Sequence, residues 1–521
     1  MKRKVGLSII IALTLLLLPS IALAADADLT SADSPYDLSA HAHIAGDTIT
    51  ILNNQIVELT GTAPVGVKIV CNKGATLTLR DVIIDVSASN NCALSTIGKN
   101  ITLIIEGASN LKSGNFEPGI KVEGTTSLEI NGSGSIDVTC GDGGAGIGGG
   151  YQKSAGSITV SGGKVTAIGG VEGAGIGGGG KGDGGSIILS GGDITATGGI
   201  GAAGIGAGLK GASGSIKVSG AIVKAAGGSY GSGIGSGYNG IVNKIIITSG
   251  EVNAIGSVGG AGIGIGYVDS KNKSGTIEIS GGTHTATGGD AGAGIGGGYN
   301  GAINRISITG GTITASGGIA GAGIGGGQDG EGGMMHISSS DITALGGAGG
   351  AGIGGGLNGH GGTINIYNAT VMANSGTYAA GIGGGYASGV RTISISDSEV
   401  YATGDVTNGA QDIGVGDGGS GGKLRIGGDS AVFIEHEAIN SLVPSIPYPT
   451  YQTLTGPGDV PPGYIVPPTW TYNVGLYRGT APLFIENPQT GQHIDYRIFA
   501  VIVSIFVVVM VFVLIKPKQQ N

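Results

Sequence analysis

A phrase of four residues, Ala-Gly-Ile-Gly or a close variant, recurs along most of this chain and limits the folds that are open to it. Its Ile stands at positions 147, 176, 205, 234, 263, 295, 324, 353, 382 and 413. The steps are 29 residues long, except for one step of 32 and a last step of 31 residues. A fixed period of this length is typical of solenoids, in which the units stack and bury a common core. The sequence therefore predicts a repeat protein.

Each repeat contains three short stretches in which apolar and polar residues alternate. After A-G-I-G-x-G comes a variable loop, then x-I-x-[IV]-[ST]-G-G, then x-[VI]-x-A-x-G-G; in the first unit these lie at 145–150, 157–163 and 164–170. Alternation over three to five positions with Gly at each boundary predicts three short strands per unit.

The composition narrows the architecture further. Gly makes up 114 of the 521 residues, and interior Gly costs a helix about 1 kcal/mol relative to Ala, so a helix-rich fold is excluded. Collagen is excluded as well, because it needs Gly at every third position. We predict an all-β chain, a right-handed parallel β-helix of about 13 coils with about 29 residues per regular coil, since crossovers between parallel strands are right-handed.

Stacking the units predicts which side chains face the interior. Because a strand alternates faces, three uniform columns should point inward. The first is apolar: Ile158, Ile187, Ile216, Ile245, Ile277, Ile306, Met335, Ile364 and Ile393. The second is Ala at 167, 196, 225, 254, 286, 315, 344, 373 and 402. The third is Val or Ile except at His284, for which we expect a hydrogen-bonded core position.

Both ends of the chain carry membrane-targeting patterns. Three basic residues precede an apolar run and a small-x-small site, which predicts a signal peptide at 1–24. An apolar run predicts a transmembrane helix at 498–515 with a cytoplasmic tail at 516–521. Between them we expect an N-terminal segment and cap at 25–60, the β-helix repeat domain at 61–435 and a Pro/Tyr-rich stalk at 436–497. This organisation predicts an exported, single-pass cell-surface protein with its N-terminal body outside.

Charge and cysteine usage bear on partners. The chain has 26 basic and 35 acidic residues; five basic and no acidic residues lie in the two targeting ends, so the exterior part carries 21 against 35, a net charge of −14. We therefore expect no nucleic-acid partner, because phosphate binding needs clustered Lys and Arg. The three cysteines, Cys71, Cys92 and Cys140, leave at least one unpaired.

The chain resembles the secreted right-handed β-helix proteins of a carbohydrate-binding domain family, and prokaryotic adhesin-like surface proteins with G-A-G-I-G-G-G repeats. The resemblance covers about residues 41–435. It rests on the strand Thr48-Ile49-Thr50-Ile51, on the segments 119–122 and 127–130, and on the G-A-G-I-G-G-G units. It implies a parallel β-helix and a carbohydrate ligand. Family members that bind calcium use clustered acidic oxygens, and no position of this repeat is acidic throughout, so we expect no metal and no cofactor.

A catalytic reading would make the chain a polysaccharide lyase or hydrolase. The outward column that begins at Lys164 holds Asp193 and Glu251 two coils apart, at about 9.6 Å, which is too far for a retaining glycosidase pair and at the limit for an inverting pair. Lys224 falls between them. A solvated ladder of charges explains this column, and we expect no catalytic residues. His41 and His43 form an H-x-H pattern without a third ligand nearby, which fits an exposed cap rather than zinc.

Tyrosines make the most suggestive pattern. The fourth residue after the repeated Ile is Tyr on three consecutive coils, at Tyr238, Tyr267 and Tyr299. Loop residues follow close behind each of them: Asn239, Asp269 and Asn300. Aromatic rings flanked by amides and carboxylates are suited to sugars, since rings cover apolar sugar faces and polar groups bind hydroxyls. The alternative is that the rings only cap the turn.

These observations favour a membrane-anchored surface β-helix, carbohydrate-binding or adhesin-like and without catalytic activity. Its partners would be a polysaccharide or cell-surface glycan, and the membrane through the C-terminal helix. A structural rod or envelope spacer without a ligand is the alternative, and a polysaccharide lyase or hydrolase is a weaker one.

Overall fold

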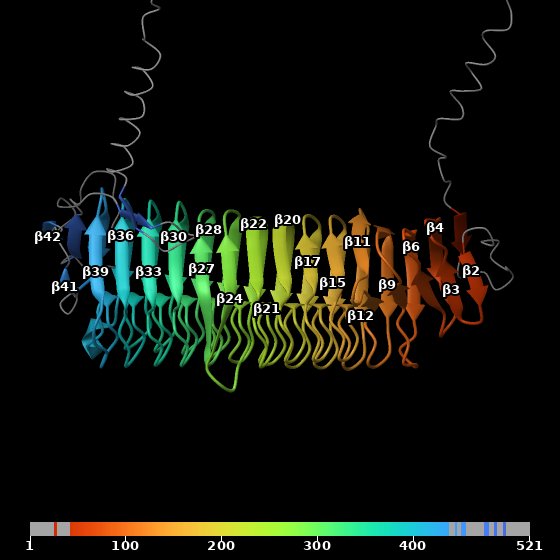
Figure 1. Ribbon diagram of the computed structural model, residues 1–521, viewed down its shortest axis with the longest axis horizontal. Coiled ribbons are helices and arrows are strands. Elements are labelled where there is room, and N and C mark those ends of the chain that lie inside the picture. The colour runs from red at the N-terminus through yellow and green to blue at the C-terminus, as the bar shows by residue number, and fades with distance from the viewer. Residues whose placement is uncertain are drawn as a thin grey trace, which may run out of the picture.

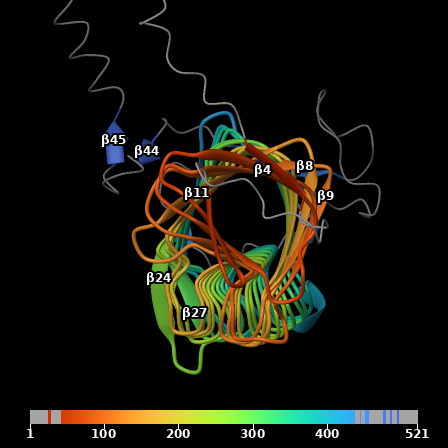
Figure 2. The same ribbon diagram turned by 90° about the vertical axis from the view of Figure 1, so that its right-hand side faces the viewer.

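The chain forms a rod of stacked coils (Figures 1 and 2). In the computed structural model the structure describes residues 25–28, 42–436, 443–444, 450–454, 474–478, 484–486 and 493–495. The predicted signal peptide, transmembrane helix, cytoplasmic tail and His41 lie outside these residues. In the described part of the chain, no helix has the length and apolar character needed to cross a membrane.

Three strand columns run along the rod, as the sequence predicts, and each strand pairs in parallel with its counterpart in the next coil. The first column contains the Ala-Gly-Ile-Gly strands and their N-terminal equivalents: β3 (Thr48–Ile51), β5 (Lys68–Cys71), β7 (Leu94–Thr96), β10 (Ile120–Lys121), β13 (Ile147–Gly148), β16 (Ile176–Gly177), β19 (Ile205–Gly206), β21 (Ile234–Gly235), β23 (Ile263–Gly264), β26 (Ile295–Gly296), β29 (Ile324–Gly325), β32 (Ile353–Gly354), β35 (Ile382–Gly383) and β38 (Ile413–Gly414).

The second and third columns form the other two faces. The second comprises β4 (Ile56–Thr62), β8 (Ile101–Glu106), β11 (Ser127–Gly132), β14 (Ser157–Val160), β17 (Ser186–Leu189), β24 (Asn272–Ile279), β27 (Gly301–Ile308), β30 (Met334–Ser338), β33 (Thr363–Tyr367), β36 (Thr392–Ser396) and β39 (Lys423–Gly427). The third comprises β9 (Ala108–Lys112), β12 (Ser135–Thr139), β15 (Lys164–Ile168), β18 (Asp193–Thr197), β25 (Thr283–Thr287), β28 (Thr312–Ser316), β31 (Asp341–Leu345), β34 (Thr370–Asn374), β37 (Glu399–Thr403) and β40 (Ala431–Ile434). Three longer strands contribute to both columns: β6 (Thr76–Asp85), β20 (Ser215–Ala226) and β22 (Lys244–Ile255).

The core confirms the three predicted inward columns. Every member of the Ile/Met, Ala and Val/Ile columns is buried, including His284, and the strands pair in the register that the repeat predicts, such as Val223 with Val252. The residues that follow the Ile/Met column, from Thr159 to Ser394, point to the opposite face of their strands, and all of them are at least partly exposed except Ser307, which is 8% exposed. The result is an all-β, right-handed solenoid of about 13 coils.

Each Ala-Gly-Ile-Gly segment folds back on itself, which explains its second Gly. The amide of Ala145 donates to the carbonyl of Gly149 at 2.9 Å, and the same bond recurs in later coils, for example from Ala261 to Ile265. The tuck directs Ile263 into the core and sets Gly264 at φ +142°. A Cβ on Gly264 would lie 1.9 Å from the carbonyl oxygen of Gly296 in the next coil. No residue with a side chain fits there without displacing backbone.

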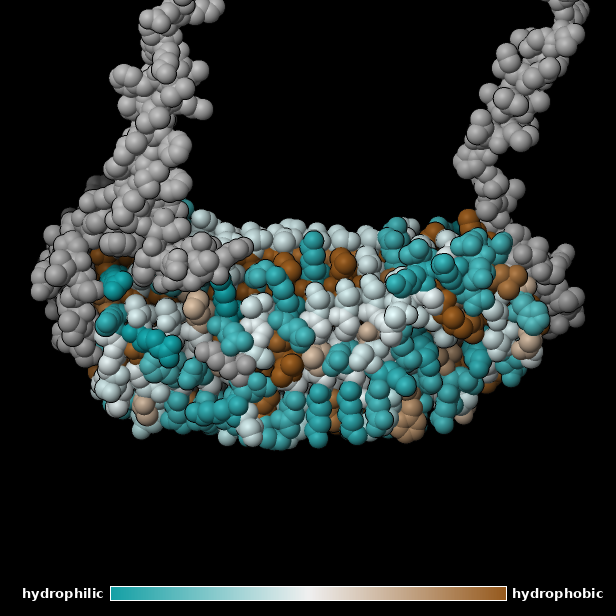
Figure 3. Space-filling view, viewed as in Figure 1, coloured by the Kyte–Doolittle hydropathy of each residue, from teal (hydrophilic) through white to brown (hydrophobic). Residues whose placement is uncertain are grey.

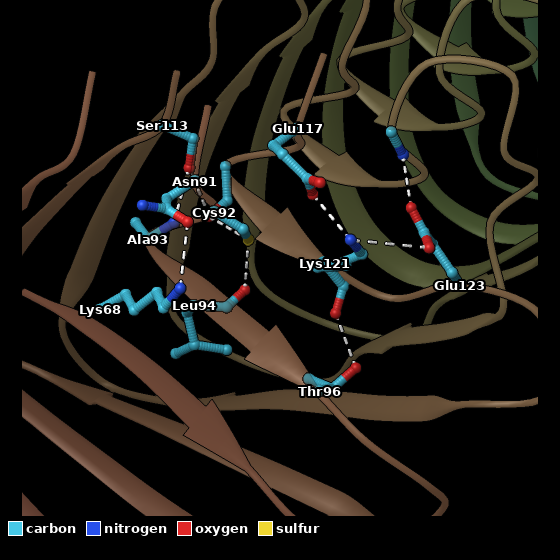
Figure 4. A network of polar contacts seen from close by, with 12 residues as sticks. Lys68, Asn91, Cys92, Ala93, Leu94, Thr96, Ser113, Glu117, Lys121 and Glu123 are labelled. Atoms are coloured by element: carbon cyan, nitrogen blue, oxygen red, sulfur yellow. Dashed lines mark hydrogen bonds and ion pairs between the residues drawn. The ribbon is translucent and has the colours of Figure 1, made fainter. Parts of the chain in front are cut away.

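The first coils lack these glycine tucks, and side chains provide the contacts instead (Figure 4). Lys121, which pairs with Gly148 in the next coil, donates to Glu117 at 2.7 Å and lies 3.9 Å from Glu123. Glu123 in turn accepts the amide of Gly150 at 2.8 Å. The irregular start is therefore joined to the regular repeat through a half-buried ion-pair network.

Additional strands lie at both ends of the stack. At the N-terminal end β2 (Ala42–Ala45) forms a hairpin with β3, and β1 (Ala25–Asp28) pairs with β4. Strands β3 and β4 already pair in parallel with β5 and β6, so the stack begins within the predicted 25–60 segment. At the C-terminal end η1 (Val406–Asn408) is a single 3₁₀ turn.

Some strands fall within the range for which we predict the stalk, and three of them extend the last coil. They are β41 (Val443–Pro444), β42 (Thr450–Leu454), β43 (Val474–Arg478), β44 (Phe484–Glu486) and β45 (His493–Asp495). Strand β41 pairs with β39, and β43 lies antiparallel between β40 and β42. The backbone edge of β40 is therefore covered by chain.

The face of the rod seen in Figure 3 is mostly hydrophilic, with separate hydrophobic patches rather than one continuous area.

All three cysteines are free thiols. Burial raises the pKa of each, Cys71, Cys92 and Cys140, to about 12. Because the thiolate is the reactive form, burial disfavours reaction of these thiols at neutral pH.

Candidate functional site

The three predicted tyrosines form one contiguous row, which we call the Tyr ladder (Tyr238, Tyr267 and Tyr299). Ring centroids lie 5.7 Å apart between Tyr238 and Tyr267 and 4.6 Å apart between Tyr267 and Tyr299. Their planes differ by 30° and 20°, so Tyr267 and Tyr299 stack and Tyr238 packs against Tyr267 at a tilt. Each ring is half-buried.

A fourth tyrosine, which our sequence reasoning missed, packs beside the ladder. Tyr230 is 41% exposed and lies 5.7 Å from Tyr238 and 5.4 Å from Tyr267 between ring centroids. It stands on the turn before the Ala-Gly-Ile-Gly strand, whereas the ladder stands on the turn after it. The back-folded tuck brings these two turns together. The Ser229-Tyr230-Gly231 turn in the sequence was the signal, but its proximity depends on the tuck, which periodicity does not reveal.

The backbone fixes where the ladder stands. The amide of Tyr267 donates to the carbonyl of Tyr230 in the preceding coil at 2.9 Å, and that of Tyr238 donates to Gly201 at 2.8 Å. The Tyr267 ring covers Gly259, whose Cβ would lie 2.5 Å from the Tyr267 Cδ2 atom. The Tyr267 ring thus closes the mouth of its tuck, and in other coils Leu209 and Leu357 cover the equivalent glycines. The ladder has a structural role whatever else it does.

Asp269 is the polar centre of the cluster. The Tyr238 hydroxyl donates to its Oδ1 and Oδ2 atoms at 2.7 and 2.8 Å, and the Asn239 amide donates to Oδ2 at 2.6 Å. These bonds from Asn239 and Tyr238 stabilise the carboxylate and lower the pKa of Asp269. In return the bond to the carboxylate raises the pKa of the Tyr238 phenol. At neutral pH the site presents an exposed carboxylate and a protonated phenol.

The two predicted asparagines make different hydrogen bonds. Both adopt the left-handed conformation, with φ +53° at Asn239 and +55° at Asn300, which Asn tolerates better than most residues. Asn239 touches Asp269 through its side chain, whereas the Asn300 amide donates to the backbone carbonyls of Val268 and Asp269 at 3.1 and 3.3 Å. All six predicted residues therefore lie in one cluster, and Asn300 mainly supports its backbone.

The 32-residue coil places an enlarged loop beside the cluster. Its loop in the green part of the rod, beside β24 and β27, projects beyond the neighbouring turns (Figures 1 and 2). A pocket of about 140 Å³ opens there, next to Tyr299, and is lined by Lys271, Asn272, Asn300, Ala302, Asp329, Gly330 and Glu331. In a regular solenoid, an irregular loop on a rigid frame is where binding groups accumulate.

The remaining candidate residues do not converge. Asp193 and Glu251 each pair with Ile222, from opposite sides, so they lie two coils apart as expected. His284 is buried, its Nε2 atom is 2.7 Å from the carbonyl oxygen of Gly281, and burial lowers the pKa of the ring. This confirms a hydrogen-bonded core histidine. In the part of the chain that the structure describes, no three His, Cys, Asp or Glu side chains are placed to hold a metal ion.

A family model described as the β-helix repeat matches six segments of the chain, at 128–151, 158–180, 187–209, 277–299, 306–328 and 364–386. Each segment starts at an inward residue of the second column and ends at the position that the ladder occupies in its coil. Curated proteins and solved structures yield no match. The matched repeats and the stacked coils together show a parallel β-helix protein.

Proposed function

We propose that this parallel β-helix protein is an exported, membrane-anchored surface protein that binds a polysaccharide or cell-surface glycan and has no catalytic activity. The observation that carries the proposal is the convergence of three tyrosines packed in a row, an exposed carboxylate and a pocket around one irregular coil. The binding site comprises Tyr238, Asn239, Tyr267, Asp269, Tyr299 and Asn300. The anchor would be the apolar segment 498–515.

The geometry determines how a sugar would contact the ladder. Tyr299 stacks on Tyr267, Tyr238 packs against it at a tilt of 30°, and Tyr230 meets it edge-on. The packed rings therefore leave a sugar little free ring face on which to stack. A glycan therefore binds along the row through its hydroxyls rather than by stacking on a single ring. Asp269 still has lone pairs to accept sugar hydroxyls, since a carboxylate offers about four acceptor sites and two donors, the Tyr238 hydroxyl and the Asn239 amide, already bind it.

The affinity of the Tyr ladder for a glycan should depend on the length of the glycan chain. Each contact is weak, but coils repeat at about 4.8 Å, so an extended polymer meets several rungs at once and its contacts act together. A short oligosaccharide that reaches one coil gains only one set of contacts. We expect affinity to rise steeply with chain length until the ladder and the 140 Å³ pocket are both covered.

The test is a glycan array with the full chain, followed by calorimetry on the polymers retained. Asp269→Ala should weaken polymer binding about 5-fold, because an exposed hydrogen-bonded charge contributes roughly 1 kcal/mol. The melting temperature should fall by no more than about 2 °C, since the bonds from Tyr238 and Asn239 that are lost are exposed. Replacing all three ladder tyrosines by Ser should abolish binding. Tyr386→Ser is the matched control, because Tyr386 holds the same position in its coil and packs on Tyr378 away from the ladder.

Other outcomes would reject the proposal. No retained glycan would favour a structural rod or envelope spacer. New unsaturated or reducing ends in the bound polymer would identify a lyase or hydrolase. Normal binding by the Asp269→Ala variant, or by the folded fraction of the triple variant, would remove the site assignment.

A further inference from the structure

A second polar site begins at the far end of β27, the strand that follows the last tyrosine of the ladder, and continues along the next four coils. We call it the corner groove: an open cavity of about 470 Å³ at the corner between the second and third columns. Its lining is Gly311, Thr312, Ser339, Ser340, Asp341, Asn368, Ala369, Thr370, Asp397, Ser398, Glu399 and Asp429. Asn300 precedes strand β27 and Gly311 follows it, so the groove is separate from the ladder site.

The groove arises where the Gly-Gly corner of the repeat is replaced by residues with side chains. Earlier coils turn at pairs such as Gly281-Gly282, whereas three consecutive later coils turn at Ser339, Asn368 and Asp397, with φ between +47° and +49°. Thr312, Asp341, Thr370 and Glu399 stand in register beside them. With Asp429 the lining spans five coils, about 19 Å at the ~4.8 Å spacing of neighbouring strands.

All the charged side chains in the lining are negative. The lining contains four carboxylates, on Asp341, Asp397, Glu399 and Asp429, and no Lys, Arg or His. These carboxylates do not form a group that could hold a metal ion among the described residues. Negative charge is therefore distributed along the groove instead of being focused at one point. That distribution suits a ligand whose positive charges are spaced along a chain.

Two buried acceptors in the lining lack partners. Ser340 is 6% exposed, and its Oγ atom makes no hydrogen bond in the structure. The Asp397 Oδ2 atom is likewise without a partner, although Oδ1 accepts the amide of Asp429 at 3.0 Å. At the equivalent position two coils later, by contrast, Ser398 donates to the carbonyl of Ser396 at 2.7 Å. A buried polar atom that lacks a bond costs about 1–3 kcal/mol, and a ligand that donates hydrogen bonds would relieve that cost.

We propose that the corner groove binds a linear chain bearing protonated amines, such as a polyamine or a deacetylated amino-sugar oligomer. Each ammonium group donates up to three hydrogen bonds, which matches the carboxylates and the unpartnered Ser340 hydroxyl and Asp397 oxygen. The hydroxyl groups of Thr312, Ser339 and Thr370 line the walls between them. The inference does not depend on glycan binding at the ladder.

The experiment is calorimetry on the full chain with three probes: spermine, a glucosamine tetramer and an N-acetylglucosamine tetramer. The two sugars have the same length and differ in charge. We expect the glucosamine tetramer to bind at least 10-fold more tightly than its acetylated counterpart, and its affinity to fall when ionic strength rises from 0.02 to 0.5 M because the sites are exposed. Binding of spermine alone would assign a polyamine, and binding of glucosamine alone would assign the amino sugar.

Variants locate the site. Asp341→Asn and Asp429→Asn should each weaken binding by about 1.5- to 5-fold, the effect of one exposed ion pair, and the double variant more. Glu251→Gln is the matched control, because Glu251 occupies the Asp341 column three coils earlier and outside the groove. Melting temperatures should match the parent chain. The triple Tyr→Ser variant of the ladder should bind amines normally, which separates this test from that of the proposed function.

Three results would overturn the proposal. The first is that both tetramers bind, and that the charged and the acetylated tetramer do so with equal affinity. The second is a loss in Glu251→Gln as large as that in Asp341→Asn. The third is calcium binding abolished by the groove variants in a chain that binds none of the amines.

Discussion

At the scale of the residue, glycine in this chain is a steric requirement rather than a source of flexibility. Where the Ala-Gly-Ile-Gly segment tucks inward, the second Gly packs its α-carbon against the carbonyl of the next coil, with φ between +132° and +143° from Gly148 to Gly414. Elsewhere glycine is replaceable: Gly46 has φ +56° and nothing within 4 Å of its Cβ position. The two kinds of glycine look alike in the sequence.

Gly264→Ala should therefore be strongly destabilising. The new Cβ would lie 1.9 Å from the Gly296 oxygen, and backbone strain and overpacking each cost about 1–3 kcal/mol. We expect a loss of at least 2 kcal/mol in the free energy of unfolding, measured by denaturant titration. Gly46→Ala, which meets only the conformational cost, should lose about 1 kcal/mol. Equal losses in the two variants would contradict the packing argument.

The residue scale also marks the limit of prediction from sequence. The six site residues could be named because they recur at fixed offsets from a repeated Ile. Tyr230 could not, because its contact with the ladder requires the back-folding of a two-residue strand. Nor could the corner groove, since its residues interrupt the Gly-Gly pattern and reveal their common position only when the coils are superimposed in space.

At the scale of the element, the alternation of apolar and polar residues determines which side chains of a strand face the core and which face solvent. In β22 the inward Ala254 is fully buried, whereas Asn253 and Ile255 on either side of it in the sequence are exposed. This alternation, together with the period of 29 residues, was sufficient to predict strand positions, register and core. The two-column strands β20 and β22 run through corners that read Ser219-Gly220-Ala221 and Thr248-Ser249-Gly250 instead of Ser-Gly-Gly. The loss of Gly-Gly did not suffice to predict them, because a later corner without it, at Ser339, does break the strand.

Ala254→Leu should disturb the stack. A closely packed interior has no space for three additional carbon atoms, and overpacking costs about 1–3 kcal/mol. Asn253→Leu is the control, since the neighbouring side chain is exposed and the change adds apolar bulk to the surface. We expect the melting temperature to fall for the first variant and to stay within about 2 °C for the second. The reverse order would place the Ala column on the outside.

At the scale of the whole molecule, each coil contacts mainly its two neighbours, so the protein is nearly one-dimensional. About 13 coils at ~4.8 Å give a stack roughly 60–65 Å long. Repetition alone was enough to predict this shape. The ends were not predictable, because the hairpin β2–β3 and the antiparallel strands β42 and β43 follow no repeat.

A rod of this kind should be visible by negative-stain electron microscopy as a straight particle about three times longer than wide, with no globular lobe of comparable mass. Far-UV circular dichroism should be dominated by β structure, because the only helix among the described residues is the three-residue η1. Helical content beyond that of one 18-residue segment would contradict the fold.

The 32-residue coil has a consequence for assembly. Neighbouring coils are so alike that a strand could pair one coil too early or too late and still bury Ile on Ile. Slippage across this coil is different: it would set the three extra residues against a coil with no matching loop. It would also break the bonds from Tyr238 and Asn239 to Asp269 and from Asn300 to Val268, which join three successive coils. The irregular loop thus determines which coil pairs with which, and so fixes the register of a stack whose other units are nearly interchangeable.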